Sequence, residues 1–145
     1  MNDAQKLVVD ASIIVKWFVE EESSEASQII RDKYIKGEID IIAPQLILFE
    51  TLNALRYKEL FTEPEIKEIS EALDAYSLNL YSLRGEYAEK TVEVAFTNNV
   101  TIYDSSYISL ALLENTRLYT ADQKLIESLG EDHQKIVKNI KELKE

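Results

Sequence analysis

The chain has 145 residues, of which 46% are hydrophobic and 30% are charged, and its formal net charge is −11. This length and balance predict a single globular domain over residues 1–145, and the negative charge argues against a broad basic surface for nucleic acid. The chain has no cysteine, one histidine and only three isolated glycines. This composition excludes disulfides, cysteine-based metal centres, multi-histidine sites and a glycine-rich phosphate loop.

The first half of the chain alternates between strand-like and helix-like segments. Runs of consecutive apolar residues predict buried strands, and apolar residues spaced by three or four predict helices. Pro44 is expected to open a long helix because proline suits a first helical turn. The expected elements, in chain order, are a strand at 6–10, the start of a helix at 12–18, a helix at 23–37, a strand at 39–43, and helices at 44–60 and 62–77.

The second half of the chain continues the same alternation. The expected elements are a strand at 78–83, a helix at 86–99, a strand at 100–103, a helix at 105–115, a strand at 117–120 and a helix at 122–130. The tail at 133–145 fits either a strand or a helix. Strands that alternate with helices predict an α/β fold, in which parallel strands are joined by right-handed crossovers and helices cover both faces of the sheet.

No segment reads as a targeting signal or a membrane span. The most apolar run, at 7–19, contains Asp10 and Lys16 and is too short to cross a bilayer. We therefore expect a cytoplasmic protein without a membrane partner.

Three aspartates occupy equivalent places, each between a predicted strand and the helix that follows it. Asp10 ends the run KLVVD, Asp104 follows VTIY, and Asp122 ends RLYTAD. Helix capping alone explains each of them, because aspartate is a preferred N-cap residue. It does not explain why the other predicted helices begin without one. Ligands bind at the carboxyl edge of a parallel sheet, so the set predicts a shared carboxylate site.

Glu50 is the fourth candidate, and it lies in the middle of the predicted helix at 44–60. Residues on its side of the helix include Ile47 and Ala54, so its side chain is expected to face the protein. A buried carboxylate needs an ion-pair partner, a hydrogen bond or a metal ion. The alternative is a surface glutamate at the edge of a groove.

A set of four carboxylates in a chain without cysteine predicts a site for a hard divalent cation, Mg²⁺ or Mn²⁺. Such an ion relieves the repulsion between the acids and supports attack of water on a phosphodiester, a reaction that needs no protein nucleophile. The predicted catalytic and metal-binding residues are Asp10, Glu50, Asp104 and Asp122. Three polar residues are candidates for hydrogen bonds to these acids, although caps or solvated side chains explain them equally: Ser12, Asn53 and Thr120.

Four segments resemble, in order, the motifs of PIN-domain ribonucleases, particularly the VapC toxins of toxin–antitoxin pairs. They are VVDASIIVKWF, PQLILFETLNAL, TIYDSSYISLA and LYTADQKL. The resemblance implies a three-layer α/β/α sandwich with a five-stranded parallel sheet, and it assigns the four acids to a Mg²⁺ or Mn²⁺ site. It also implies an RNA substrate, a homodimer, and a small antitoxin protein whose tail enters the active-site groove.

Three other functions stay open at this point. One is a PIN-type nuclease that processes RNA without being a toxin, and another is a PIN-like binding module that has lost catalysis. The third is a receiver-type phosphoacceptor domain, which is typically marked by adjacent acids after the first strand and a lysine after the fifth. Because the chain is so acidic, RNA binding is expected to be confined to a small patch that includes Lys16, Arg56 or Lys124.

The predicted helical segments at 44–60 and 64–77 carry more apolar residues than one face of a sheet needs. This excess predicts a two-fold interface between two copies of the chain. The residues expected there are Leu48, Leu52, Leu55, Leu60, Ile66, Ile69, Leu73 and Tyr76.

Overall fold

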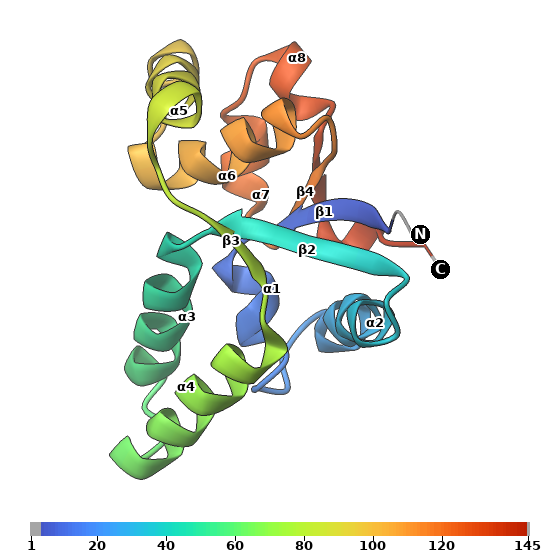
Figure 1. Ribbon diagram of the computed structural model, residues 1–145, viewed down its shortest axis with the longest axis vertical. Coiled ribbons are helices and arrows are strands. Elements are labelled where there is room, and N and C mark those ends of the chain that lie inside the picture. The colour runs from blue at the N-terminus through green and yellow to red at the C-terminus, as the bar shows by residue number, and fades with distance from the viewer. Residues whose placement is uncertain (1–3, 145) are drawn as a thin grey trace.

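A single parallel sheet forms the centre of the computed structural model, which describes residues 4–144 (Figure 1). Its strand order is β3-β2-β1-β4-β5. The strands are β1 (Gln5–Val9), β2 (Ile39–Pro44), β3 (Asn79–Tyr81), β4 (Leu118–Thr120) and β5 (Val137–Asn139). The predicted α/β fold with a five-stranded parallel sheet is therefore confirmed. Residues 1–3 and 145 of the expected single domain lie outside the described residues.

Helices cover both faces of this sheet, and they give the three layers visible in Figure 1. One layer holds α1 (Ala11–Val15), α2 (Ser24–Ile35), α3 (Leu46–Tyr57) and α4 (Glu63–Tyr76). The opposite layer holds α5 (Gly85–Asn98) and α6 (Ile102–Leu113). The chain then continues through α7 (Gln123–Glu127), α8 (Glu131–Gln134) and the 3₁₀ helix η1 (Ile140–Glu142). Between residues 4 and 144, no helix has the length and apolar character needed to cross a membrane.

The segment VTIY at 100–103 is not a strand, contrary to the prediction. Thr101 caps α6 by accepting a hydrogen bond of 3.0 Å from the Asp104 amide, and Ile102 opens the helix. A short apolar run does not distinguish strand from helix, and the cap decides the outcome. The fifth strand comes instead from the tail, where β5 pairs in parallel with β4.

Pro44 ends β2 rather than opening α3, which begins at Leu46. Pro44 pairs with Tyr81 of β3 in the parallel ladder. A proline removes only one hydrogen-bond donor, and at the last residue of a strand this loss is tolerated.

The apolar residues of α3 and α4 pack inside the molecule. Leu55, Ile69 and Leu73 are buried, and four of the other five residues of the predicted dimer face pack against the core. Only Leu60 remains exposed, at 65%. These residues mainly cover the core and the contacts between α3, α4 and α1, so the burial favours another surface for the predicted two-fold interface.

Candidate active site

The four predicted acids line one cavity of about 420 Å³: Asp10, Glu50, Asp104 and Asp122. The cavity lies where the strand order reverses. The chain passes from β1 outward through β2 to β3, and then returns to place β4 on the other side of β1. In an open parallel sheet, ligands bind outside the carboxyl ends of the strands at this reversal.

Asp10 follows β1 directly and caps α1. Its Oδ1 accepts hydrogen bonds from the Ser12 amide (3.1 Å) and the Ser12 hydroxyl (2.5 Å), and its Oδ2 accepts one from the Thr120 hydroxyl (2.5 Å). The Ser12 hydroxyl oxygen in turn accepts a bond from the Ala121 amide. Both hydroxyl residues singled out in the sequence thus hold Asp10, and they tie it to the loop after β4.

Asp122 and Asp104 reach the cavity from two helix N-termini. Asp122 caps α7, where its Oδ1 accepts a hydrogen bond of 3.1 Å from the Leu125 amide. Asp104 lies in the first turn of α6 and is half-buried. Because α6 leads back into the parallel strand β4, it starts at the carboxyl edge of the sheet. Asp104 therefore reaches the cavity although no strand precedes it.

Glu50 points from α3 toward α6, where the Tyr107 hydroxyl donates a hydrogen bond of 2.6 Å to its Oε1. Tyr107 is only 2% exposed, and sequence reasoning missed it. Its spacing was the available signal, because a residue three positions after Asp104 lies on the same face of a helix. Asn53 does not line the cavity and is exposed, whereas Ala54 takes the place one turn after Glu50.

The cavity raises the pKa of three of its acids. Burial raises the pKa of Asp10 to about 6, against the hydrogen bonds from Ser12 and Thr120, which favour the ionised form. Burial also raises the pKa of Glu50, whereas the Tyr107 hydroxyl lowers it. The pKa of Asp104 is raised mainly by burial and also by the negative charge of Asp122. In the same way, the charge of Glu50 raises the pKa of Asp10, and the charge of Asp104 raises the pKa of Glu50.

This mutual repulsion fits a divalent cation. Carboxylate oxygens are the ligands that Mg²⁺ and Mn²⁺ prefer, and a cation among the four acids would stabilise their ionised forms. Within residues 4–144 the acids do not form a ready-made ligand cage. A cation bound there would therefore have to draw the acids together.

The free energy of unfolding of the chelator-treated protein should fall as pH rises from about 4 to about 6. Asp10 titrates near pH 6 in the folded state and near pH 3.9 in the unfolded chain, so the folded state binds more protons between these values. The contribution from protonated Asp10 is present below pH 4 and is lost as pH rises through about 6. Urea denaturation of the wild type and Asp10→Asn at pH 5, 6 and 7 measures it. A difference between the two proteins that does not change with pH would contradict this titration.

Replacing Asp104 by asparagine should leave the metal-free protein equally or more stable, by up to about 1 kcal/mol. The change removes one of the repelling charges, and the Asp104 amide still donates to Thr101. Thermal melting with EDTA and with Mg²⁺ measures the effect, and Mg²⁺ should stabilise the wild type more than the variant. A strongly destabilised variant in EDTA would mean that the carboxylate is mainly structural.

Comparisons with known proteins agree with this arrangement. The PIN domain family matches residues 7–131 of the chain. The chain is 30% identical to "Ribonuclease VapC3" of Pyrobaculum aerophilum over 129 residues, which are 84% of this chain and 93% of that protein.

Solved structures share the fold. The structure of PAE2754 from Pyrobaculum aerophilum is 21% identical with a TM-score of 0.62, and it covers 95% of this chain and 92% of that one. VapBC2 from Rickettsia felis, bound to a DNA fragment from its promoter, is 14% identical with a TM-score of 0.63 over 93% of this chain and 98% of that one. A toxin–antitoxin complex from Klebsiella pneumoniae is 15% identical with a TM-score of 0.59, covering 81% of this chain and 88% of that one. With its four acids gathered at the switch point of a parallel sheet, the chain belongs to the PIN domain family and is a VapC-type member of it.

Proposed function

We propose that this protein is a metal-dependent endoribonuclease and the toxin of a VapBC-type pair. The observation that carries this proposal is the convergence of four carboxylates in one cavity, with two hydroxyls holding the most strongly shifted of them. The name of the VapC3 relative supports RNA as the substrate. The four carboxylates would hold a divalent cation that activates a bound water molecule, so we propose water as the attacking group.

The roles of the residues follow from their contacts. Mg²⁺ or Mn²⁺ would lower the pKa of a water molecule and neutralise charge that develops on the phosphate oxygens. Asp10 and Asp104 are the proposed direct ligands, with Glu50 and Asp122 completing the set or orienting the water. Ser12 and Thr120 favour the ionised form of Asp10, because both donate to its carboxylate. Tyr107 does the same for Glu50.

End-group analysis of cleaved RNA tests this proposal. Because water attacks and the 2′-hydroxyl takes no part, the products should carry a 5′-phosphate and a 3′-hydroxyl, and EDTA should abolish cleavage. Cyclic 2′,3′-phosphate ends, or cleavage that persists in EDTA, would overturn the mechanism.

We further propose a small antitoxin as the cytoplasmic partner of this chain. The Klebsiella structure is a toxin–antitoxin complex, and the Rickettsia structure holds a VapBC pair. Co-expression with the product of a neighbouring small gene tests this. The two proteins should co-purify, and the complex should cleave RNA more slowly than the free toxin does.

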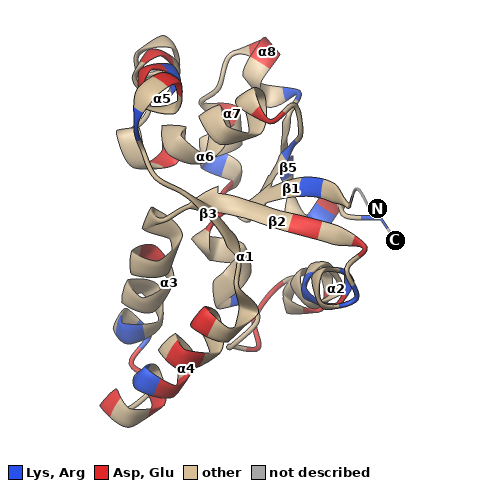
Figure 2. Cartoon of the chain, viewed as in Figure 1, with Lys and Arg blue, Asp and Glu red and all other residues tan. Residues whose placement is uncertain are grey.

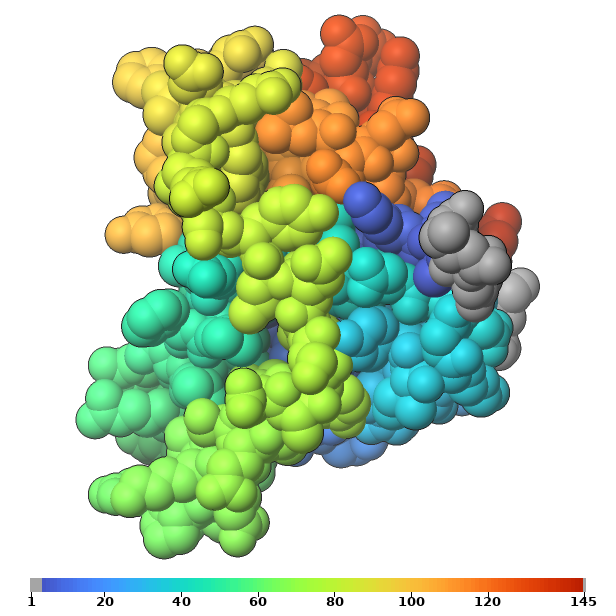
Figure 3. Space-filling view, viewed as in Figure 1, coloured from blue at the N-terminus to red at the C-terminus, as the bar shows by residue number. Residues whose placement is uncertain are grey.

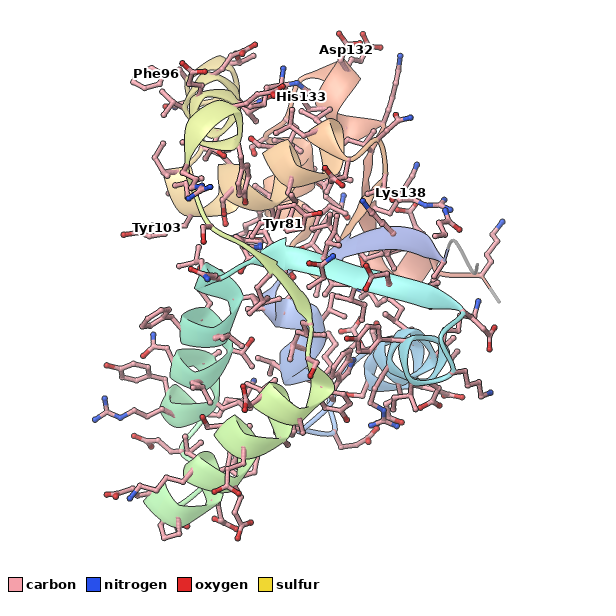
Figure 4. The ribbon with its side chains drawn as sticks, in the orientation of Figure 1. Tyr81, Phe96, Tyr103, Asp132, His133 and Lys138 are labelled. Atoms are coloured by element: carbon pink, nitrogen blue, oxygen red, sulfur yellow. The ribbon has the colours of Figure 1, made fainter. Side chains whose placement is uncertain are left out.

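A homodimer is proposed on a different surface from the one expected from the sequence. Exposed apolar residues gather on α3, on α5, at the start of α6 and in the loop before α5. They are Phe49, Leu83, Val92, Phe96, Ile102 and Tyr103, here called the apolar side. Figure 3 shows these elements next to one another along one side of the molecule, and Figure 4 shows Phe96 and Tyr103 pointing outward there. An exposed patch of this kind suits a two-fold contact.

A further inference from the structure

The cavity that holds the four acids also has a basic end. Lys16, Glu21 and Lys58 line it together with the acids. Of the three cations expected from the sequence to contact RNA, only Lys16 lines this cavity, and Arg56 and Lys124 do not. In a chain with a net charge of −11, two lysines beside four carboxylates need an explanation.

The two lysines share one carboxylate. Lys16 Nζ lies 3.4 Å from Glu21 Oε2, and Lys58 Nζ lies 3.2 Å from Glu21 Oε1. Both distances exceed the roughly 2.7–2.9 Å of a well-made charge-assisted hydrogen bond. Glu21 Oε1 is buried and has no partner in hydrogen-bond geometry, so the Lys58 contact is an ion pair only. Glu21 is therefore a loosely held anion between two cations.

Lys16 is unusual among lysines because it is only 6% exposed. A lysine is almost never buried without a partner, and here the partner is a single carboxylate at 3.4 Å. The Glu21 backbone is anchored separately, through the bond that its amide donates to the Ser24 hydroxyl. The Glu21 side chain can therefore leave the lysines without displacing the loop that carries it.

The helices fix the distance between the acidic and the basic ends. Asp10 is the N-cap of α1 and Lys16 is its C-cap, while Glu50 lies inside α3 and Lys58 is the C-cap of that helix. At about 1.5 Å per residue, each lysine lies roughly 9–12 Å along its helix from the acid before it. Figure 2 shows basic residues at the ends of α1 and α3 that point away from the sheet. A cation at a helix C-terminus is also favoured by the helix dipole.

We propose that Lys16 and Lys58 form a subsite for a phosphate of the RNA strand beside the one that is cleaved, and that the Glu21 carboxylate occupies this subsite in the free protein. This inference rests on the proposed ribonuclease function. Substrate binding exchanges one anion for another, since a backbone phosphate displaces Glu21 from the two ammonium groups. The exchange explains how so acidic a protein holds RNA. The Glu21 carboxylate competes with the phosphate for the two ammonium groups, and this competition weakens the binding of arbitrary strands.

Binding of a fluorescein-labelled single-stranded RNA tests the subsite, measured by anisotropy in Ca²⁺ at several salt concentrations, with strand integrity checked on a gel. Lys58→Ala should weaken binding about tenfold. It should also reduce the slope of log Kd against log salt by about 0.7, the value for one phosphate contact on a single strand. Lys16→Gln should act in the same direction. Glu21→Gln should tighten binding about fivefold, the scale of a partly exposed ion pair.

Lys67→Ala and Glu63→Gln are the matched controls, because this exposed pair on α4 has the same chemistry at 2.9 Å and lies outside the cavity. Neither control should change the affinity or the salt slope, and melting curves verify that each variant folds. The subsite would be overturned if Glu21→Gln bound RNA no more tightly than the wild type, or if Lys58→Ala and Lys67→Ala had the same affinity and salt slope. If the wild type still cleaves RNA, these results would leave the proposed ribonuclease function intact. A wild type that neither binds nor cleaves RNA would overturn the proposed function as well.

Discussion

Replacing Asp10 by asparagine is expected to lower the rate of RNA cleavage by about a hundredfold or more. Each factor of ten corresponds to about 1.36 kcal/mol of barrier, and charge stabilisation by a metal ion contributes several kcal/mol. Asp10 lines the cavity, and Ser12 and Thr120 hold both of its oxygens. Asparagine keeps one oxygen that can accept from Ser12, so the fold should survive while the charge is lost. Single-turnover cleavage at saturating Mg²⁺ measures the effect.

Asp132→Asn is the control for this experiment. It makes the same change of charge and shape on α8, where the Asp132 side chain is 95% exposed and projects from the far end of the molecule in Figure 4. This variant should cleave RNA at the wild-type rate. Equal rates for all three proteins would remove Asp10 from the mechanism, and an equal loss in both variants would point to net charge rather than to the site.

The acids were found from the sequence with unequal justification. Asp10 and Asp122 follow strands and cap helices, as their positions after apolar runs predicted. Asp104 was placed correctly for the wrong reason, since VTIY opens a helix whose cap is Thr101. The prediction survived because a crossover helix that enters a parallel strand must start at the carboxyl edge, which is the edge where the other strands end.

Other features needed the three-dimensional structure. The spacing from Asp104 places Tyr107 on the cavity side of α6, but no local pattern encodes its hydrogen bond to Glu50 on a different helix. Asn53 was expected to lie beside Glu50 in the site, but the residue of α3 that lines the cavity one turn after Glu50 is Ala54. The strand β5 has only three residues, and its pairing with β4 determines its conformation more than its own propensity does.

The surface for self-association also depends on which apolar residues the core leaves exposed. Replacing Phe49 by glutamate should convert a dimer into a monomer at micromolar concentration. Phe49 is 76% exposed, and it lines an apolar cavity of about 300 Å³ with Leu83 and Tyr103. Truncating a central aromatic residue of an interface costs about 2–4 kcal/mol, or roughly 30- to 1,000-fold in Kd, and burying a charge costs more. Light scattering across a dilution series measures the change in mass.

Because Phe49 precedes Glu50, a second variant is needed that is remote from the acids. Phe96→Glu on α5 meets this need: Phe96 is 83% exposed and lies on the same side of the molecule as Tyr103 in Figure 4. The control is Ile35→Glu, which places the same charge on an apolar residue that is 62% exposed at the end of α2 and outside the apolar side. If the dimer forms through the apolar side, both phenylalanine variants should be monomers and the Ile35 variant should remain a dimer. A monomeric wild type, or dimers in all three variants, would show that these exposed aromatic residues serve another contact.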